Sequence, residues 1–422
     1  MTLSPPESRP EDALGLRGRF LRTRGESEAL ARPLSAEDQT VQTMADVSPT
    51  KWHLAHTTWF FDVFILEAFE PGYRPVNTAY RSLFNSYYNG VGPQYARPQR
   101  GHLSRPGVAE ILAYRNQVTA RVVTLLESWG NDVPAGAASL LELGINHEQQ
   151  HQELLLTDIK HVLGTNPLHP VYQGPGALRA VEAAPELRWR SFEGGPVAIG
   201  HDGLGFTFDN EGPRHTVWLE PFRLATRPVT CGEYLAFMAD GGYQRPELWL
   251  SAGWAIAQER GWRAPLYWEP DGEGWGLYTL GGFRPVVADE VLSHVSFFEA
   301  AAYAKWAGRR LPTEFEWETA VRGMEEEGNF ADSRLFHPAR AGERMFGDVW
   351  KWTASAYLPY PGYREADGAV GEYNGKFMSS QMVLRGGSAA TPAGHVRATY
   401  RNFFPPDARW QFTGLVLAED QR

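Results

Sequence analysis

Two histidines four residues apart, His147 and His151, are the clearest candidates for metal chemistry in the chain. They lie in the segment INHEQQHQELLL, residues 145–156. Residues at i and i+4 share one face of an α-helix, so two imidazoles at this spacing can hold one ion. The histidines of H-E-x-x-H metalloproteases follow the same logic. On this spacing alone an exposed or capping pair is the more common explanation, so a metal site requires a third ligand.

A third imidazole is available in the segment KWHLAH, which contains His53 and His56. His56 shares a helical stripe with three apolar residues, Trp52, Trp59 and Val63. This stripe points His56 inward, so we expect it to be the third ligand in preference to His53, which lies nearer Phe60 and Phe64. The alternative is a core histidine hydrogen-bonded to a carbonyl. Three neutral imidazoles would leave coordination positions open and suit zinc or non-haem iron.

Four helical segments in the first part of the chain can position these histidines. They cover residues 17–34, 48–69, 106–130 and 137–161, and the second has Ser48 as the predicted N-cap and Pro49 at the first helical position. Facing helices of a bundle often supply metal ligands. The sequence therefore predicts a four-helix bundle with the histidines inside.

A long, mostly non-helical connection separates the second and third helices, from about residue 71 to 105. Connections of this length inside a compact domain are usually functional or disordered. This one contains five tyrosines, Tyr73, Tyr80, Tyr87, Tyr88 and Tyr95. Because so aromatic a loop fits disorder poorly, we expect it to be functional.

The character of the sequence changes near residue 185, where glycines and tryptophans alternate with short apolar segments. Three capping boxes predict short helices, at Thr230–Glu233, Ser296–Glu299 and Thr313–Glu316. This pattern indicates an irregular α+β domain. The predicted organisation is a helical bundle over residues 1–165, a linker over 166–185 and a second domain over 186–422.

Composition limits the classes of partner. The 422 residues include 40 basic and 50 acidic side chains, a net charge of −10, which argues against nucleic acid or an anionic membrane as the main partner. No apolar run approaches the ~18 residues that cross a bilayer, and residues 1–20 lack the apolar core of an export signal. With Cys231 as the single cysteine, no intramolecular disulfide can form. We expect a cytoplasmic protein.

Motifs along nearly the whole chain, from about residue 30 to 420, resemble the ergothioneine-pathway sulfoxide synthases. They are SPTKWHLAH, LFNSYYNGVG, ARPQRGHLSRP, NHEQQHQELLLTDIKH, MFGDVWKWT, EYNGKFM, VLRGGS and YRNFFPPDARWQFTG. The resemblance implies a multidomain α and α+β fold. A DinB-like four-helix bundle is followed by a C-type-lectin-like domain of the formylglycine-generating-enzyme, or sulfatase-modifying-factor, type.

The same resemblance implies an enzyme that uses Fe(II) and O₂ to join a thiol sulfur to the imidazole C2 of hercynine, forming a sulfoxide. The implied iron ligands are His56, His147 and His151. Gln150 and Asn402 match hercynine-binding positions. The stretch after Asn402 is rich in aromatic faces that suit a trimethylammonium group, including Phe403, Phe404 and Trp410, although each of these also fits a domain core.

Four residues of the long loop match or suit positions around the thiol substrate. Tyr87 and Tyr88 match active-site tyrosines of the branch that accepts free cysteine, where a phenol can donate a proton; ordinary loop packing is the alternative. Arg97 and Arg100 offer guanidinium forks for an amino-acid carboxylate; Arg97 is preferred, because Arg100 also fits a surface charge. Phe404 replaces an acidic residue of the branch that uses γ-glutamylcysteine, so cysteine is the expected donor.

Other readings stay open. A selenoneine synthase would couple hercynine with a selenosugar, and a γ-glutamylcysteine-using enzyme would share this architecture. A zinc-dependent thiol transferase, as some DinB-like bundles are, would work without O₂. A lectin-like binding module with a vestigial metal site would not depend on His147. Copper-dependent formylglycine generation is excluded, because it requires a pair of cysteines.

Overall fold

The computed structural model describes residues 15–174 and 183–421. The chain divides into two units, residues 1–162 and 163–422. The first 14 residues, part of the stretch searched for an export signal, lie outside the described residues. So do residues 175–182 of the predicted linker. Residues 169–173 of that linker belong to the second unit and pack within it, where Tyr278 donates a hydrogen bond to the Pro170 carbonyl.

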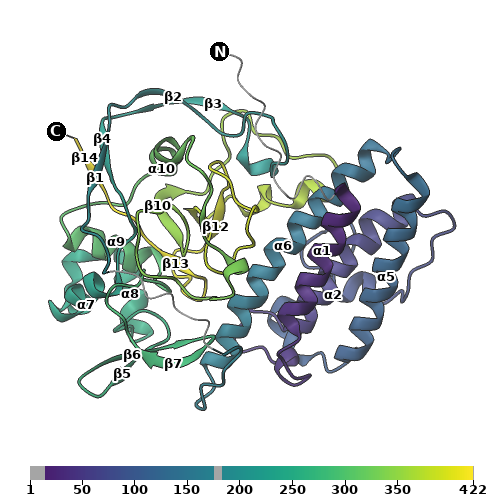
Figure 1. Ribbon diagram of the computed structural model, residues 1–422, viewed down its shortest axis with the longest axis horizontal. Helices are drawn as coiled ribbons and strands as arrows, with labels where there is room; N and C mark the ends of the chain where they lie inside the picture. Colours follow the sequence, from purple (N-terminus) through teal and green to yellow (C-terminus); the bar gives the residue numbers. More distant parts are fainter. Residues whose placement is uncertain (1–14, 175–182, 422) are drawn as a thin grey trace. The chain divides into compact units, whose positions relative to one another are not determined.

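Four long helices form the first unit and confirm the predicted bundle (Figure 1). They are α1 (Gly15–Ala31), α2 (Thr50–Phe61), α5 (Val108–Trp129) and α6 (Ala135–Gly164). Helix α2 continues through a π-helical turn, Asp62–Leu66, into the short α3, Glu67–Phe69. The long loop contains only α4 (Tyr80–Leu83) and a 3₁₀ segment, Arg97–His102.

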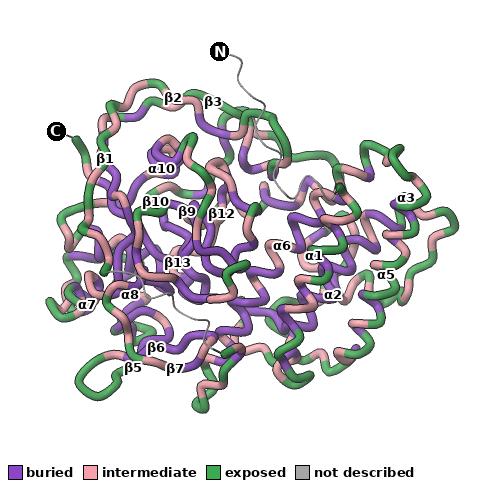
Figure 2. The backbone as a smooth tube through the Cα atoms, in the orientation of Figure 1, coloured by how far each residue is buried: buried purple, intermediate pink, exposed green. Residues whose placement is uncertain are grey.

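Helix α2 lies in the interior of this unit, and all twelve of its residues are buried (Figure 2). A helix surrounded on all sides is normally apolar throughout, yet this one contains His53 and His56. Buried polar groups must be hydrogen-bonded to avoid a desolvation cost. The polar residues of α2 therefore require partners on other helices.

The predicted N-cap of α2 is wrong. Pro49 occupies the N-cap position without a side-chain cap hydrogen bond. The Ser48 hydroxyl instead accepts a hydrogen bond from Arg100 at 2.9 Å, and the Ser48 N–H donates to Asp158 at 2.8 Å. Tertiary partners from the long loop and α6 thus replace the local cap.

Short sheets and helices form the second unit, as the α+β prediction requires. The central four-stranded sheet has the order β12-β11-β10-β13, and a three-stranded sheet has the order β1-β4-β14. The strands of these two sheets are β10 (Trp350–Ala356), β11 (Met382–Arg385), β12 (Asn402–Phe404), β13 (Thr413–Gly414), β1 (Trp189–Phe192), β4 (Phe222–Ala225) and β14 (Ala418–Asp420). The remaining strands pair as β2 (Gly195–Ile199) with β3 (His215–Leu219), β5 (Trp268–Asp271) with β6 (Gly274–Thr279) and β7 (Gly282–Pro285), and β8 (Gly328–Asn329) with β9 (Phe346–Gly347).

All three predicted capping boxes are confirmed, and each starts a helix. Thr230, Ser296 and Thr313 begin α7 (Cys231–Ala239), α9 (Phe297–Trp306) and α10 (Glu314–Val321). A further helix, α8, covers Ser251–Glu259. These local signals were readable because each box satisfies the first backbone N–H groups of its own helix.

Strand β12 contains three of the predicted site residues and forms the edge of the central sheet. Asn402 pairs with Leu384 and Phe404 with Met382 of β11. Arg401, directly before the strand, forms a buried ion pair with Glu314 at the start of α10, 2.8 Å from Nε to the carboxylate. The edge strand is therefore anchored to the core of the second unit.

Candidate metal centre

Three imidazoles from two helices meet inside the bundle. His56 of α2 and His147 and His151 of α6 offer ligand atoms that all lie within 4.8 Å of one another. Their ring centroids are separated by 4.6, 4.7 and 5.0 Å, and the Nε2 atoms of His56 and His147 lie 3.2 Å apart. The i, i+4 spacing on α6 and the inward stripe on α2 are thus brought together as the sequence predicted.

The geometry and protonation of this cluster suit a metal ion. Nitrogen ligands about 2.0–2.1 Å from one ion, at roughly 90–110° to each other, lie about 3.0–3.4 Å apart, and the His56–His147 distance falls in this range. Burial lowers the pKa of His147 to about 3. Burial, and then neighbouring imidazoles, lowers the pKa of His56 and of His151 well below its ordinary value. All three rings are neutral at ordinary pH, the form that metals bind.

The ring of His56 is fixed on three sides. Its Nδ1 lies 2.7 Å from the Phe84 carbonyl, so this nitrogen donates its proton and Nε2 remains to face the centre. The indole of Trp52 stacks on one side, with centroids 4.7 Å apart and planes at 9°, and Trp59 stacks at 5.5 Å. A ligand held in this way is preorganised for one coordination geometry.

Glu148, the residue after His147, is surrounded by hydrogen-bond partners from other helices. It lies between Arg24 of α1 and Arg115 of α5, and Ser27 donates to it at 2.6 Å. Burial opposes the charge of Glu148, but Arg115 and then Arg24 outweigh burial and lower its pKa to about 2. The carboxylate therefore ties α6 to two other helices.

The two predicted tyrosines pack near His56 through an aromatic chain. Tyr88 is fully buried, and its ring lies 5.5 Å from Trp59, which stacks on His56. Tyr87 stacks on Tyr88 at 4.5 Å, with the two hydroxyl oxygens 3.4 Å apart. Loop packing accounts for part of this arrangement, and it also places two phenols together beside the aromatic wall of the metal centre.

The two predicted arginines differ in environment. Arg97 is exposed and donates to the Asp46 carbonyl. Arg100 is only 4% exposed, so the alternative that it is a surface charge is wrong. Its guanidinium lies 3.3 Å from the ring centroid of Trp52, and burial, followed by Arg97, lowers its pKa well below the ordinary value. Stacking on the indole compensates the buried cation.

The remaining predicted residues belong to both units. Gln150 is half-buried on α6, directly before His151. Asn402, Phe403 and Phe404 are half-buried on β12 in the second unit. Phe403 stacks on Tyr357 at 4.1 Å, and Phe404 meets Trp410 edge to face at 5.7 Å. These contacts show that the aromatic residues also pack within the second unit.

Asp158 has no predicted role, and His56 is preferred to His53 as the third ligand, yet both Asp158 and His53 lie beside the cluster. His53 Nδ1 is 2.9 Å from His151 Nδ1, and His53 Nε2 is 2.9 Å from Asp158 Oδ2. The available signal was spacing, because Asp158 follows His151 by seven residues, two helical turns on the same face. A helical wheel of α6 would have placed Asp158 on the same side as His151, which faces α2.

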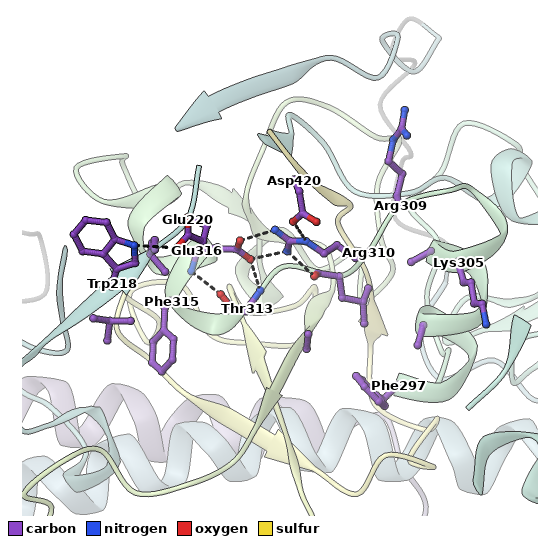
Figure 3. A pocket seen from close by; sticks show the side chains of 16 residues that line it. Trp218, Glu220, Phe297, Lys305, Arg309, Arg310, Thr313, Phe315, Glu316 and Asp420 are labelled. Atoms are coloured by element: carbon purple, nitrogen blue, oxygen red, sulfur yellow. Dashed lines mark hydrogen bonds and ion pairs between the residues drawn. The ribbon is translucent and has the colours of Figure 1, made fainter. Parts of the chain in front are cut away.

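A separate hollow in the second unit does not involve the predicted site residues. It is lined by parts of β3, α9 and α10 (Figure 3). Its central cation, Arg310, is paired with Glu316 at 2.7 Å and with Asp420 at 2.7 Å. The charge of Arg310 is therefore neutralised by two carboxylates.

Both units match known families. Residues 19–155 match the DinB superfamily, and residues 188–344 and 336–421 match the sulfatase-modifying factor enzyme 1-like domain. Within residues 15–174 and 183–421, no helix combines the length and apolar character that a membrane crossing requires. A DinB bundle with three clustered histidines, joined to a domain of this type, defines a two-domain non-haem iron oxygenase.

Full-length relatives identify the family. The chain is 33% identical over 408 residues to hercynine oxygenase of Mycolicibacterium smegmatis, covering 89% of this chain and 91% of that protein. It is 32% identical over 406 residues to hercynine oxygenase of Mycobacterium tuberculosis, covering 89% and 91%. The formylglycine-generating enzyme of Streptomyces coelicolor is 35% identical over 302 residues, 58% of this chain and 95% of that one. The chain belongs to the hercynine oxygenase family.

Proposed function

We propose that this protein joins the sulfur of cysteine to the imidazole C2 of hercynine, using Fe(II) and O₂, in ergothioneine biosynthesis. The reaction balances as thiol plus hercynine plus O₂ giving the sulfoxide adduct plus water. The S–H and C2–H bonds break, a C–S bond forms, one oxygen atom goes to sulfur and the other leaves as water. The cluster of three neutral histidines, in a chain that matches hercynine oxygenases over 89% of its length, supports this function.

His56, His147 and His151 would hold the iron by one nitrogen each. Bound Fe(II) would supply O₂ activation and would lower the pKa of a coordinated thiol. The protein's own contribution is positional, because three ligands from two packed helices would leave further coordination positions of the metal for substrates. Holding both substrates there makes bond formation effectively unimolecular.

Gln150, Asn402, Phe403 and Phe404 are proposed to bind hercynine, on the basis of the sequence resemblance. A trimethylammonium group cannot donate a hydrogen bond, so aromatic faces and oriented amide oxygens are its natural partners. Asn402 and Phe403 lie on an anchored edge strand. An edge strand held in this way can present side chains with little loss of conformational entropy.

The long loop is proposed to serve the thiol substrate. Arg97, which is exposed, is the better candidate for binding the cysteine carboxylate, and Arg100 would contribute through its position under Trp52. Tyr87 and Tyr88, with stacked rings, would supply a phenolic proton close to the aromatic wall of the centre. The replacement of an acidic residue by Phe404 favours cysteine over γ-glutamylcysteine as donor.

Anaerobic reconstitution tests this function. The full chain is loaded with Fe(II) and mixed with hercynine, O₂ and one of cysteine, γ-glutamylcysteine or a selenosugar, and the products are identified by mass spectrometry. A sulfoxide adduct with cysteine that disappears in His147→Ala is expected. A preferred adduct with another donor would correct the substrate, and no adduct with any donor would reject the proposed chemistry. Turnover with zinc and without O₂ would favour a thiol transferase.

A further inference from the structure

Two buried side chains, His53 of α2 and Asp158 of α6, form a chain of contacts with the predicted ligand His151. His53 of α2 lies between His151 and Asp158 of α6, at 2.9 Å from each. His53 is 3% exposed and Asp158 is 2% exposed. At this depth the polar atoms of His53 and Asp158 need hydrogen-bond partners, because leaving them unpaired would be costly.

The order of the groups allows a proton arrangement that leaves His151 ready to bind a metal. In this arrangement the Asp158 carboxylate accepts a hydrogen bond from Nε2 of His53. Nδ1 of His53 then accepts a hydrogen bond from Nδ1 of His151. His151 is left with an unprotonated Nε2, which is the atom a metal requires.

We propose that His53 and Asp158 are positioning residues of the metal centre, forming a relay that sets the tautomer and ring orientation of His151. The proposal rests on the three-histidine metal site proposed above. In this proposal Nδ1 of His53 accepts the Nδ1 proton of His151, just as the Phe84 carbonyl accepts the Nδ1 proton of His56. Both ligands would thus be held through Nδ1 and would face the ion through Nε2.

The relay is rigid because its ends lie on one helix and its middle on another. Asp158 and His151 are two turns apart on α6, whereas His53 lies on α2, one turn before His56. Asp158 is itself fixed, because its Oδ2 also accepts the Ser48 N–H at 2.8 Å. Partners of this kind typically change metal affinity about 10- to 100-fold when they are removed.

Two substitutions of His53 separate positioning from packing. His53→Phe keeps a ring of similar volume but removes the acceptor for His151 and the donor to Asp158. His53→Gln loses the ring but keeps an amide oxygen that can accept and an NH₂ that can donate. A relay requires Gln to function better than Phe, whereas a packing role requires the opposite order.

Binding of Co(II) to the full chain is the readout, measured by chelator competition and by the visible absorption spectrum of the bound ion. We expect His53→Phe to weaken binding about 10- to 100-fold and to change the spectrum, and His53→Gln to lie closer to wild type. Asp158→Asn tests the other end of the relay and should weaken binding about tenfold. Val122→Ala is the matched control, since it removes a buried side chain of α5 that has no polar atoms.

The outcomes are distinct. Wild-type affinity and spectrum in both His53→Phe and Asp158→Asn, or a better result for Phe than for Gln, would overturn the relay. If His53→Phe does not fold, the Gln and Asn variants decide. Co(II) binding needs neither hercynine nor O₂, so the relay can hold even if the proposed reaction fails. Wild-type binding in His147→Ala would instead reject the metal site itself.

Discussion

The two faces of helix α6 show how adjacent residues can have opposite electrostatic environments. His147 and His151 face α2, where burial keeps their imidazoles neutral. Glu148, one residue after His147, faces α1 and α5, where Arg115 and Arg24 keep its carboxylate charged. The face with the histidines can therefore bind a metal cation, whereas on the other face the carboxylate of Glu148 is already paired with two arginines.

Within a single turn of α6, His147 is thus placed to bind a metal and Glu148 to hold the helices together. A cluster of neutral imidazoles is suited to bind a metal, whereas a fully paired charge cluster contributes position and stability. The second unit repeats the scaffold arrangement, because Glu314 lies between Arg401 and Arg385. Substitutions on the two faces should therefore fail in different ways.

The largest effect is expected for Glu148→Gln. Losing the carboxylate leaves Arg24 and Arg115 buried with less compensation, so the free energy of unfolding should fall by about 3–5 kcal/mol. Urea denaturation of the metal-free protein measures this change. Glu142→Gln is the matched control on the same helix, because Glu142 pairs with Arg19 at a partly exposed position and should cost at most about 1 kcal/mol. Equal costs for the two variants would contradict the scaffold role of Glu148.

The second-largest effect is expected on the face of α6 that contains His147 and His151, where metal binding should increase the stability of the protein. With metal at a hundred times its dissociation constant, the wild type should gain about 2.7 kcal/mol of stability from binding. His147→Ala should gain almost none, because one of three ligands is missing, and Glu142→Gln should gain as much as the wild type. Denaturation with and without Co(II) measures the gain within each variant. A full gain in His147→Ala would show that the metal binds elsewhere.

Features determined by nearby residues were predictable from the sequence. The i, i+4 histidines, the inward stripe of His56 and the three capping boxes each depend on contacts within one helix or its first turn. The four helices followed from apolar segments that end at Pro and Gly residues. These features predicted the bundle and favoured His56 as the third histidine of the cluster.

Features determined by distant residues were not predictable. The partners of Glu148 are 124 and 33 residues away, and the Ser48 hydroxyl is occupied by Arg100, 52 residues away. Ser48 does not cap α2 because its hydroxyl accepts a hydrogen bond from the buried guanidinium of Arg100. The role of His53 could not be predicted either, because its partner Asp158 lies 105 residues away in the sequence.

The stability of the second unit should decrease at acid pH, because Glu314 is paired with Arg401 and Arg385 there. Burial opposes the charge of Glu314, but Arg401 and Arg385 lower its pKa below the ordinary value of 4.5. The unfolded state therefore takes up this proton first, so the stabilisation is complete above pH 4.5 and is lost as the pH falls below it. The slope is about 1.4 kcal/mol per pH unit for one proton.

Urea denaturation of the wild type and Glu314→Gln between pH 3 and 6 isolates this contribution. The two curves should converge as the pH falls below 4.5, because protonated glutamate and glutamine are both uncharged. Glu325→Gln, at an exposed position, should stay parallel to the wild type. A constant difference between wild type and Glu314→Gln across this range would show that the charge of Glu314 does not stabilise the fold.

The smallest predicted effect concerns the long loop, where the same contrast separates Arg97 from Arg100. Arg97 is exposed and donates to a backbone carbonyl, so its side chain can turn to a substrate, whereas Arg100 is buried against Trp52, which stacks on His56. Arg97→Gln should raise KM for cysteine about tenfold, the equivalent of about 1.4 kcal/mol, with unchanged Co(II) affinity. Steady-state kinetics and chelator competition measure the two quantities.

Arg97→Lys and Arg100→Gln complete this test. Lysine keeps the charge but loses the bidentate fork, so its KM should fall between those of wild type and Arg97→Gln. Arg100→Gln removes the cation stacked on Trp52 and the donor to Ser48, so it should weaken Co(II) binding and destabilise the bundle by about 1–2 kcal/mol. An unchanged KM in Arg97→Gln would remove Arg97 from the substrate site. The selenosugar reaction, which needs no carboxylate grip, would then become the stronger alternative.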